Sequence, residues 1–439
     1  MITLWTQFRS FDRPARVLMI NQFSINVGFY MLMPYLAGYL AGPLGLAAWA
    51  VGLVLGVRNF SQQGMFLVGG TLADRLGYKP LIVAGCLLRV AGFVLLAAVE
   101  SLPAILLASV ATGFAGALFN PAVRAYLAAD AGPRRVEAFA VFNVFYQAGI
   151  LLGPLIGLAL TTLDFRVTSL VAAAVFAVLT IVQIHALPAH RADTAEAQAS
   201  VLRNWRAVAA NRAFVLFATA MIGSYVLSFQ VYLALPLQAA AVTNDDGSAT
   251  ALVTSLFVVT GVVAIAGQLR ITAWFSRRWG SGRSLVVGMT VMAAAFLPLL
   301  VLSLSSIRTG WAAAGALLLT AALLAVGTAA VFPFEMDTVV ALSGGRLVAT
   351  HYGFYNTVVG VGILLGNLGT GAVFGFFDSS GWGALTWIVL TTLGAVCVGA
   401  LYMLDRSGRL IPVQTTTTTP EDEGPAARPA ADTKGSSGP

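Results

Sequence analysis

The stretch "GGTLADRLGYKP", Gly69 to Pro80, decides the fold of this chain. It places one acid, Asp74, with Arg75 and Lys79 in a glycine-rich segment between two long apolar runs. Apolar runs joined by a short basic segment are typical of membrane-spanning helices connected on the cytoplasmic side. The acid is the unusual feature, because basic residues alone would orient such a connection.

The composition of the whole chain supports a membrane protein. Of its 439 residues, 58% are hydrophobic and 10% are charged, whereas about a quarter of a soluble globular protein is charged. A helix of roughly 20 residues crosses the ~30 Å hydrocarbon core, where an open backbone finds no water. We therefore predict an all-α integral membrane protein with twelve transmembrane helices. Their apolar runs are residues 17–40, 48–72, 80–99, 102–127, 138–162, 166–187, 213–238, 250–274, 284–304, 312–340, 351–377 and 384–404.

Basic residues predict the orientation. Most of the 25 Lys and Arg residues fall in the N-terminal segment, in alternate connections and in the C-terminal tail, while Arg166 and Arg308 alone lie in the other connections. Because basic segments stay on the cytoplasmic side, we predict that both termini are cytoplasmic. The same topology accounts for the net charge of +7 without a nucleic-acid partner.

Two polar segments divide the chain into domains. Residues 188–212 end in "VLRNWRAVAANR", which suits a short amphipathic helix on the membrane surface. The tail that begins "PVQTTTTTPEDEG" carries too little apolar surface to fold. We predict a six-helix bundle over residues 1–187, a cytoplasmic linker over 188–212, a second six-helix bundle over 213–405 and a disordered cytoplasmic tail over 406–439.

The two predicted bundles are internal relatives. The string "GILLG" occurs in both, and matching polar residues around it favour duplication over chance similarity between apolar helices. Parallel repeats of this kind place a substrate site near the midplane between the halves, which expose it alternately by rocking against each other. The matching residues are Pro121 with Pro333, Arg134 with Arg346, and Asn143 with Asn356.

The pattern Gly70-x-x-x-Asp74-Arg75-x-Gly77-x-Lys79 resembles the signature between helices 2 and 3 of the major facilitator superfamily. The resemblance implies that Asp74 locks a cytoplasmic gate in the outward-facing transporter by contacting the start of helix 11, near His351. In physical terms, Gly70 lies one turn before Asp74 and can admit a neighbouring helix. The carboxylate can then bind N–H groups at the N-terminus of another helix or pair with a guanidinium. A solvated turn is the alternative, and it explains the basic residues but not the acid.

A second pattern, on the fifth helix, resembles the antiporter signature of the exporters in that superfamily, and so implies export. Its glycines form a stripe of small residues, and its proline bends the helix. We expect this stripe to pack against helix 8 of the other half, and a similar stripe on helix 11 to pack against helix 2. The first stripe is Gly149, Gly153, Pro154 and Gly157, and the second is Gly362, Gly366 and Gly369.

The segments "LGVRNFSQQG" and "LFNPAVRA" are similar to the MdtH-type bacterial multidrug exporters. The resemblance implies a multi-pass protein of the bacterial inner (plasma) membrane. Three positions depart from the pattern. Tyr78 stands where a basic residue is usual, Ser109 where the fourth helix often carries arginine, and Asn21 where the relatives carry an acid.

The resemblance places the substrate cavity on the inward faces of helices 1, 4, 7 and 10. Such a polar and aromatic lining would suit bulky amphipathic compounds, including cations. Charges inside a membrane are costly, so they are functional by default. Arg58 has a cavity role and a structural role as open alternatives, whereas Arg89 favours a structural role. The cavity candidates are Asn21, Asn26, Tyr30, Arg58, Asn120, Tyr225 and Gln230.

Acids within the spans are scarce, and two of them lie well inside helix 10. Glu335 and Asp337 are two residues apart, so they point to different faces of the helix. If export is coupled to proton entry, a carboxylate must bind and release protons within the pathway, and these two are the candidates. The alternative for each is a structural ion pair. The proton gradient would then supply the energy, with no cofactor.

Other function classes find little support. The chain contains no phosphate-binding Walker loop, and its three histidines and its cysteines, Cys86 and Cys397, lack the spacing of a metal site or a disulfide framework. We therefore predict a transporter rather than an enzyme, acting as a monomer on amphipathic drugs or small molecules in exchange for protons. The alternative is an importer or exporter dedicated to one metabolite, antibiotic or siderophore.

Overall fold

The computed structural model describes residues 4–41, 43–46, 48–161, 164–188, 200–243, 246–305, 310–379 and 384–410, and every regular element among them is a helix. The first half of the chain contains α1 (Leu4–Arg9), α2 (Arg13–Tyr30), α3 (Met33–Ala41), α4 (Ala48–Gln63), α5 (Phe66–Leu76), α6 (Tyr78–Ala98), α7 (Leu102–Ala131), η1 (Gly132–Arg134), α8 (Arg135–Thr161) and α9 (Phe165–Ala186). The second half contains α11 (Val201–Ala210), α12 (Arg212–Ala220), α13 (Ile222–Phe229), η2 (Gln230–Tyr232), α14 (Ala234–Val242), α15 (Asp246–Ala294), α16 (Leu297–Leu304), α17 (Trp311–Ser343), α18 (Val348–Ser379) and α19 (Ala384–Arg406).

The predicted apolar runs all coincide with helical segments. Within the described residues, eight stretches are long and apolar enough to cross a membrane. Two of them, Leu102–Gly157 and Ala251–Leu304, have 56 and 54 residues and contain a turn, at η1 and at Gly280. Across the second turn the Ser284 hydroxyl donates to the Phe275 carbonyl oxygen at 3.3 Å. The predicted all-α membrane fold is therefore confirmed.

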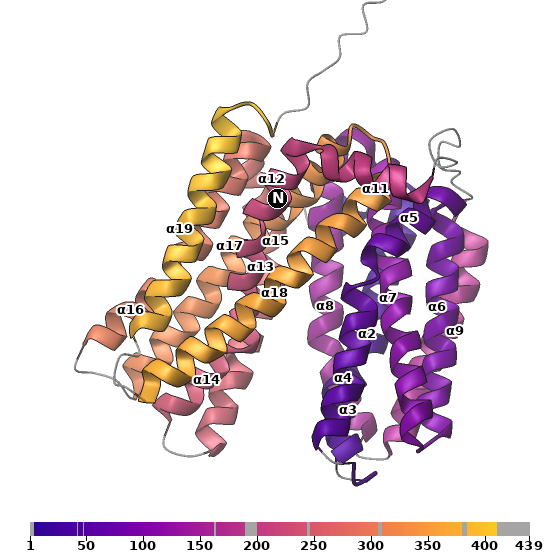
Figure 1. The fold of residues 1–439 in the computed structure, drawn as a ribbon, viewed down its shortest axis with the longest axis horizontal. Coiled ribbons are helices and arrows are strands. Elements are labelled where there is room, and N and C mark those ends of the chain that lie inside the picture. The colour runs from indigo at the N-terminus through magenta and orange to yellow at the C-terminus, as the bar shows by residue number, and fades with distance from the viewer. Residues whose placement is uncertain are drawn as a thin grey trace, which may run out of the picture.

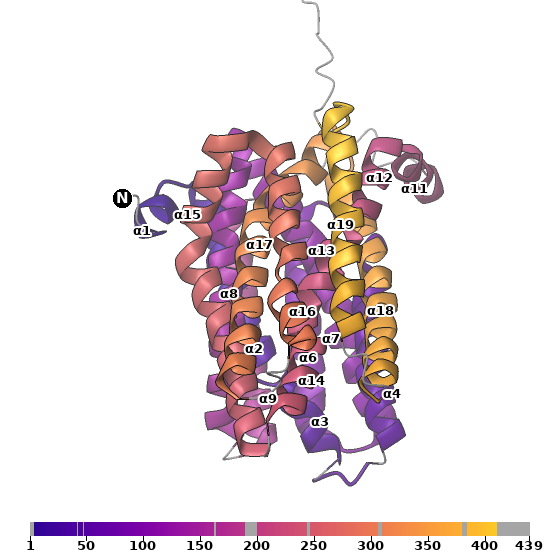
Figure 2. The same ribbon diagram turned by 90° about the vertical axis from the view of Figure 1, so that its left-hand side faces the viewer.

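The helices gather into two lobes, which correspond to the two halves of the sequence (Figure 1). One lobe contains α2 to α9 and the other contains α12 to α19. The view turned by 90° shows the helices of both lobes running along one common direction, with α1 and α11 near the same end (Figure 2). This arrangement suits helices that cross a single bilayer.

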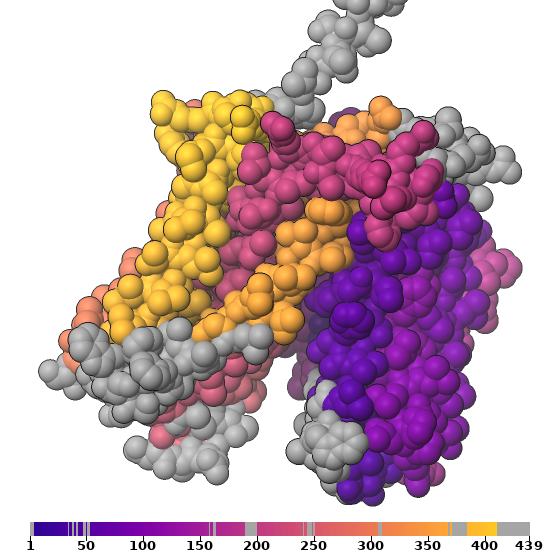
Figure 3. Space-filling view, viewed as in Figure 1, coloured from indigo at the N-terminus to yellow at the C-terminus, as the bar shows by residue number. Residues whose placement is uncertain are grey.

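The two lobes touch at one end and separate at the other. In the space-filling view they meet near α11 and α12, and an open groove divides them toward α3 and α14 (Figure 3). Helix α18 crosses from its own lobe to α5, and α15 and α17 both contact α8. We call the end near α11 the closed end and the opposite end the open end.

The glycine stripe on α8 faces α2 of its own lobe. A Cβ atom on Gly153 would come within 2.7 Å of the Tyr30 Cβ, and one on Gly157 would overlap the Met31 carbonyl oxygen. The eighth predicted transmembrane helix, residues 250–274, lies in α15. The expectation that the stripe packs against that helix was wrong. Helix α15 does reach α8, but it places Gly261 against Leu151, which lies on another face of α8 than the stripe.

The stripe on α18 differs from the prediction in the same way. Gly362 and Gly366 lie against Ile222 and Val226 of α13, and not against the second predicted transmembrane helix, which consists of α4 and α5. Helix α18 instead meets α4 and α5 through Gly353 and Gly360, nearer its start. The two stripes thus make equivalent contacts in the two lobes, α8 with α2 and α18 with α13, as expected for repeats.

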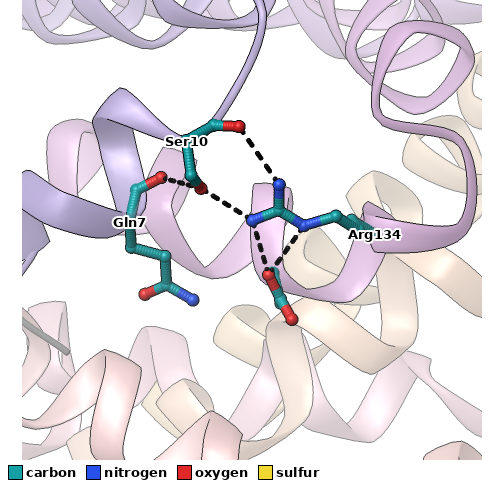
Figure 4. A network of polar contacts seen from close by, with 4 residues as sticks. Gln7, Ser10 and Arg134 are labelled. Carbon is teal, nitrogen blue, oxygen red and sulfur yellow. Dashed lines mark hydrogen bonds and ion pairs between the residues drawn. The ribbon is translucent and has the colours of Figure 1, made fainter.

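Arg134, a residue shared by the two repeats, ties the N-terminal segment to the start of α8 (Figure 4). Its guanidinium donates to the Ser10 hydroxyl at 2.8 Å and to the Glu137 carboxylate at 2.9 Å, and it lies over the Phe11 ring. The Ser10 hydroxyl in turn donates to the Gln7 carbonyl oxygen. These contacts are exposed, so they position α1 more than they stabilise the fold.

The linker contains the helix expected at its second half. This helix, α11, rests on the first lobe through Trp205, whose indole N–H donates to the Thr71 hydroxyl at 2.8 Å. Beyond it, the Asn211 side chain donates to the Leu342 carbonyl oxygen of α17 in the second lobe. Residues 189–199 of the linker and 411–439 of the predicted tail lie outside the described residues.

Candidate functional site

Asp74, near the end of α5, binds the start of α18 across the lobe boundary. Its carboxylate accepts hydrogen bonds from the backbone N–H of Ala349 at 3.1 Å, and from the backbone N–H and hydroxyl of Thr350 at 2.7 and 2.6 Å. These amides belong to the first turn of α18, where the helix dipole favours an anion. A Cβ atom on Gly70 would overlap the Ala349 carbonyl oxygen, so the glycine permits the close approach.

Asp74 is almost fully buried, with 4% of its surface exposed. It lies just beyond the predicted run 48–72. Burial raises the pKa of its carboxyl to about 6, while the hydrogen bonds from Thr350 and Ala349 act to lower the pKa. The three donors, two of them backbone N–H groups in the first turn of α18, are of the kind that favours the ionised carboxylate.

The other residues of this motif stay within the first lobe. Gly77 has a φ of 90°, a left-handed conformation that glycine adopts without strain, and it makes the turn from α5 to α6. The Lys79 ammonium donates to the Ile184 carbonyl oxygen at 2.7 Å, near the C-terminus of α9. Tyr78 is buried beside Tyr126. Arg75 is half-buried in the last turn of α5.

Helix α8 contributes two further polar contacts between the lobes. Arg135, at the start of α8, forms an ion pair with Asp337 of α17, with 2.8 Å between nitrogen and oxygen. Asn143, also on α8, donates to the Gln268 side chain of α15 at 2.6 Å, and both side chains are buried. Together with Asp74, these contacts connect the two lobes through three different helix pairs. They hold the lobes together from the closed end inward.

A cavity of about 360 Å³ lies between the lobes. The first lobe contributes side chains from α2, α7 and α8, and the second lobe contributes side chains from α13, η2, α15 and α17. Aromatic and aliphatic groups dominate its wall, with a few polar groups among them, as in binding sites for small molecules. The polar residues that line it are Tyr30, Arg124, Asn143, Tyr146, Gln147, Ser224, Tyr225, Ser228, Tyr232, Thr260, Thr328 and Glu335.

Glu335 is the carboxylate that lines this cavity, and it is 3% exposed. The Tyr355 hydroxyl donates to it at 2.5 Å, and Tyr225 and Arg124 are its other polar neighbours. Arg124 belongs to the first lobe and also donates to the Asn356 side chain of α18 at 3.3 Å. Glu335 therefore sits where both lobes and the cavity meet, whereas Asp337 is held in its ion pair.

Only some of the predicted cavity residues line the cavity, namely Tyr30 and Tyr225. Asn120 and Gln230 instead donate to carbonyl oxygens one turn earlier in their own chain segments, at 2.8 and 2.7 Å. Asn26 bonds the Tyr146 carbonyl oxygen between α2 and α8. Asn21 and Arg58 also lie outside the cavity lining. A polar side chain on an inward helix face can thus be hydrogen bonded to a backbone carbonyl oxygen instead of facing the cavity.

Sequence reasoning missed several residues at this site. Arg124 was visible as a charge at the edge of an apolar run, and that signal alone could have marked it. Tyr355 and Gln268 carried no such signal, because a tyrosine or glutamine in an apolar helix is as often packed as functional. Asn143 and Asn356 were visible as matching positions in the two repeats. The structure places both at the boundary between the lobes.

Comparison with known proteins identifies the family. The model of the Major Facilitator Superfamily matches residues 18–367. The chain belongs to that superfamily. It is 62% identical over 399 residues to an uncharacterized MFS-type transporter of Mycobacterium tuberculosis, covering 91% of this chain and 94% of the relative. It is 27% identical over 387 residues to the multidrug resistance protein MdtH of Klebsiella pneumoniae, covering 88% and 92%.

Solved structures show the same fold. The human organic anion transporter MFSD10 aligns with a TM-score of 0.64 and 16% identity, covering 89% of this chain and 99% of its own. The nucleoside transporter NupG aligns with a TM-score of 0.58 and 17% identity, covering 92% and 100%. This superfamily protein is therefore a multi-pass membrane transporter of small molecules and not an enzyme.

Proposed function

We propose that the protein exports amphipathic small molecules, drugs among them, in exchange for protons. The observation that carries this proposal is Glu335, a carboxylate in the wall of a cavity between two lobes that touch at one end. A cavity of this size lined by aromatic side chains suits a bulky amphipathic compound. The similarity to the multidrug resistance protein MdtH of Klebsiella pneumoniae supports the direction and the substrate class.

The closed end would face the cytoplasm of a bacterium. It carries α1, the linker helix α11 and the last turn of α19, the segments whose basic residues predict a cytoplasmic location. The groove would then open outward, and Asp74 would hold the cytoplasmic gate shut through its bonds to α18. Export requires that these bonds break when the lobes rock to open the other end.

Glu335 would couple this motion to protons. A carboxylate with a tyrosine hydroxyl at 2.5 Å and an arginine from the other lobe nearby can bind a proton in one state and release it in the other. A cationic substrate would favour the ionised form and so displace the proton. Protonation of Glu335 would weaken its attraction for Arg124, and a shift of Arg124 would alter the hydrogen bond that it donates to Asn356 of α18. The protein would act as a monomer.

The second candidate is a transporter dedicated to one metabolite, antibiotic or siderophore, in either direction. The cavity's separate polar groups from both lobes would equally suit one defined ligand. The two candidates differ in the number of unrelated dyes that the protein would transport and in the direction of transport.

Inverted vesicles that contain the protein test the proposal. We expect an inside-acid gradient to drive uptake of ethidium into these vesicles, which corresponds to efflux from the cell. Asp74→Asn should abolish this transport, and Lys79→Gln, in the same motif but bonded within one lobe, should keep most of it. Two results would contradict broad export. One is transport only in the opposite direction, and the other is no transport of any of several unrelated lipophilic dyes.

A further inference from the structure

The interior of the first lobe carries two arginines without a counter-charge. Arg58 of α4 and Arg89 of α6 both place their guanidinium carbons over the Phe29 ring, at 4.5 and 4.8 Å from its centroid. The ion pairs among the described residues involve other arginines, and no described carboxylate pairs with these two. Two like charges over one ring repel each other and lose hydration on burial.

The hydrogen bonds of these two arginines are incomplete. Arg89 is 5% exposed, and its Nε and Nη1 atoms have no hydrogen-bond partner. Arg58 is half-buried and donates to the side chains of Asn59 and Gln62, at 2.9 and 3.2 Å, but its Nε also has no partner. Buried donors of a charged group are nearly always paired in a native protein, so these atoms call for an acceptor.

The position of the pair connects it to the transport cavity. Tyr30, which follows Phe29, packs edge-on against the Phe29 ring and lines the cavity. It also lies within electrostatic reach of both guanidiniums. Glu335 faces the same cavity from the other lobe. The two arginines are not part of the cavity lining but lie behind Tyr30 in the first lobe, so a substrate group would have to pass Tyr30 to reach them.

We propose that Arg58 and Arg89 form a subsite for an anionic group of the substrate, such as a carboxylate or sulfonate. A guanidinium presents parallel N–H groups that match the two oxygens of such a group. The inference rests on the proposed transport function and specifies one part of its substrate. Compounds with a cationic or aromatic body and an acidic group would then be preferred over compounds that lack the acid.

Two dyes that differ in a single carboxylate test this subsite. Rhodamine B and its ethyl ester share a cationic xanthene body, but only the first carries a free acid. We would measure binding of each dye to the purified full-length protein in detergent by fluorescence anisotropy. We expect rhodamine B to bind about tenfold more tightly than the ester, roughly the ratio that one charge-assisted hydrogen bond supplies.

Variants then assign this preference to the arginines. Arg58→Gln should bring the ratio of the two affinities close to one, and Arg58→Lys should retain part of it. Arg270→Gln, which removes an exposed charge from α15, is the matched control and should keep the wild-type ratio. Arg89→Gln should also lose the preference while melting no lower than wild type, since it removes a buried cation that has no counter-charge in the described part of the chain.

Several outcomes would overturn the subsite. They are equal binding of both dyes to the wild type, an unchanged preference in Arg58→Gln, or binding of neither dye. A large fall in the melting temperature of Arg89→Gln with the preference intact would show a structural arginine instead. Ethidium has no acidic group, so its transport in vesicles succeeds or fails independently, and the two proposals can be judged apart.

Discussion

Two buried carboxylates, Asp74 at the closed end and Glu335 in the cavity, differ in the donors that face them. Asp74 accepts its hydrogen bonds from the first turn of a helix in the other lobe, so all of them depend on the lobes being together. Glu335 keeps Tyr355 and Tyr225 from its own lobe, and its polar neighbour from the described part of the other lobe is Arg124. The first group is suited to register lobe position, and the second to register protons and ligands.

The largest effect is expected from Asp74→Asn, because the change removes the charge from all three hydrogen bonds between Asp74 and α18 at once. Hydrogen bonds to a charged group contribute about 1.5–3 kcal/mol each, so losing even one shifts the gate equilibrium by roughly tenfold or more. Spin labels at the end of α5 and the start of α18 would report the gate by pulsed electron resonance. The distance between them should lengthen in Asp74→Asn and stay unchanged in Lys79→Gln.

That prediction has a clear failure. If Asp74→Asn leaves the label distance unchanged but still abolishes ethidium transport, the carboxylate acts in some step other than closing the lobes. Gly70→Ala offers an independent check. Its added Cβ meets the Ala349 backbone, so it should loosen the same contact although it leaves the charge in place.

Glu335→Gln should separate proton coupling from binding. The glutamine can still hydrogen bond Tyr355 but cannot release a proton, so a dye without a gradient should still exchange across the membrane while proton release on adding the dye disappears. Asp337→Asn is the matched control, since this acid is paired with Arg135 away from the cavity. Normal proton release from Glu335→Gln would remove it as the coupling group.

How far the sequence could anticipate these two regions follows from the range of their interactions. The membrane fold follows from apolar runs that are local in sequence. The motif around Asp74 indicates a contact with the start of helix 11, and the structure places the Asp74 carboxylate on Ala349 and Thr350. The surroundings of Glu335 could not be predicted, because Tyr355 and Arg124 come from distant segments and their type alone carries little signal.

The glycine stripes show the same limit within one helix. Their spacing indicates that some helix approaches closely, but it carries no information on which one. Gly153 and Leu151 lie on the same helix and face different neighbours, α2 and α15. Choosing between them needs the arrangement of the whole bundle. The internal repeat could have decided between these neighbours, because one pairing satisfies both stripes. In that pairing the fifth predicted helix (α8) packs on the first (α2), and the eleventh (α18) packs on the seventh, which contains α13.

A smaller effect is expected for the Arg135–Asp337 ion pair, which also joins the lobes but is partly exposed. Its side chains are 31% and 16% exposed, so solvent weakens the attraction between them. A double-mutant cycle with Arg135→Gln and Asp337→Asn, read by the same label distance, should give a coupling of about 1 kcal/mol. A coupling as large as the Asp74 effect would make this ion pair a second principal contact of the gate.

The smallest effect is expected at Asn120, which the sequence placed in the cavity and the structure does not. Its amide donates to the Gly116 carbonyl oxygen within the same helix, a contact that does not depend on lobe position or on the cavity. Asn120→Ala should therefore change ethidium transport by less than about twofold, within the range of substitutions away from a site. Tyr225→Phe is the comparison, because it removes a hydroxyl beside Glu335 and should alter the pH dependence of transport. If Asn120→Ala changed ethidium transport more than Tyr225→Phe did, the cavity in use would extend along α7, beyond the residues that line it in this state.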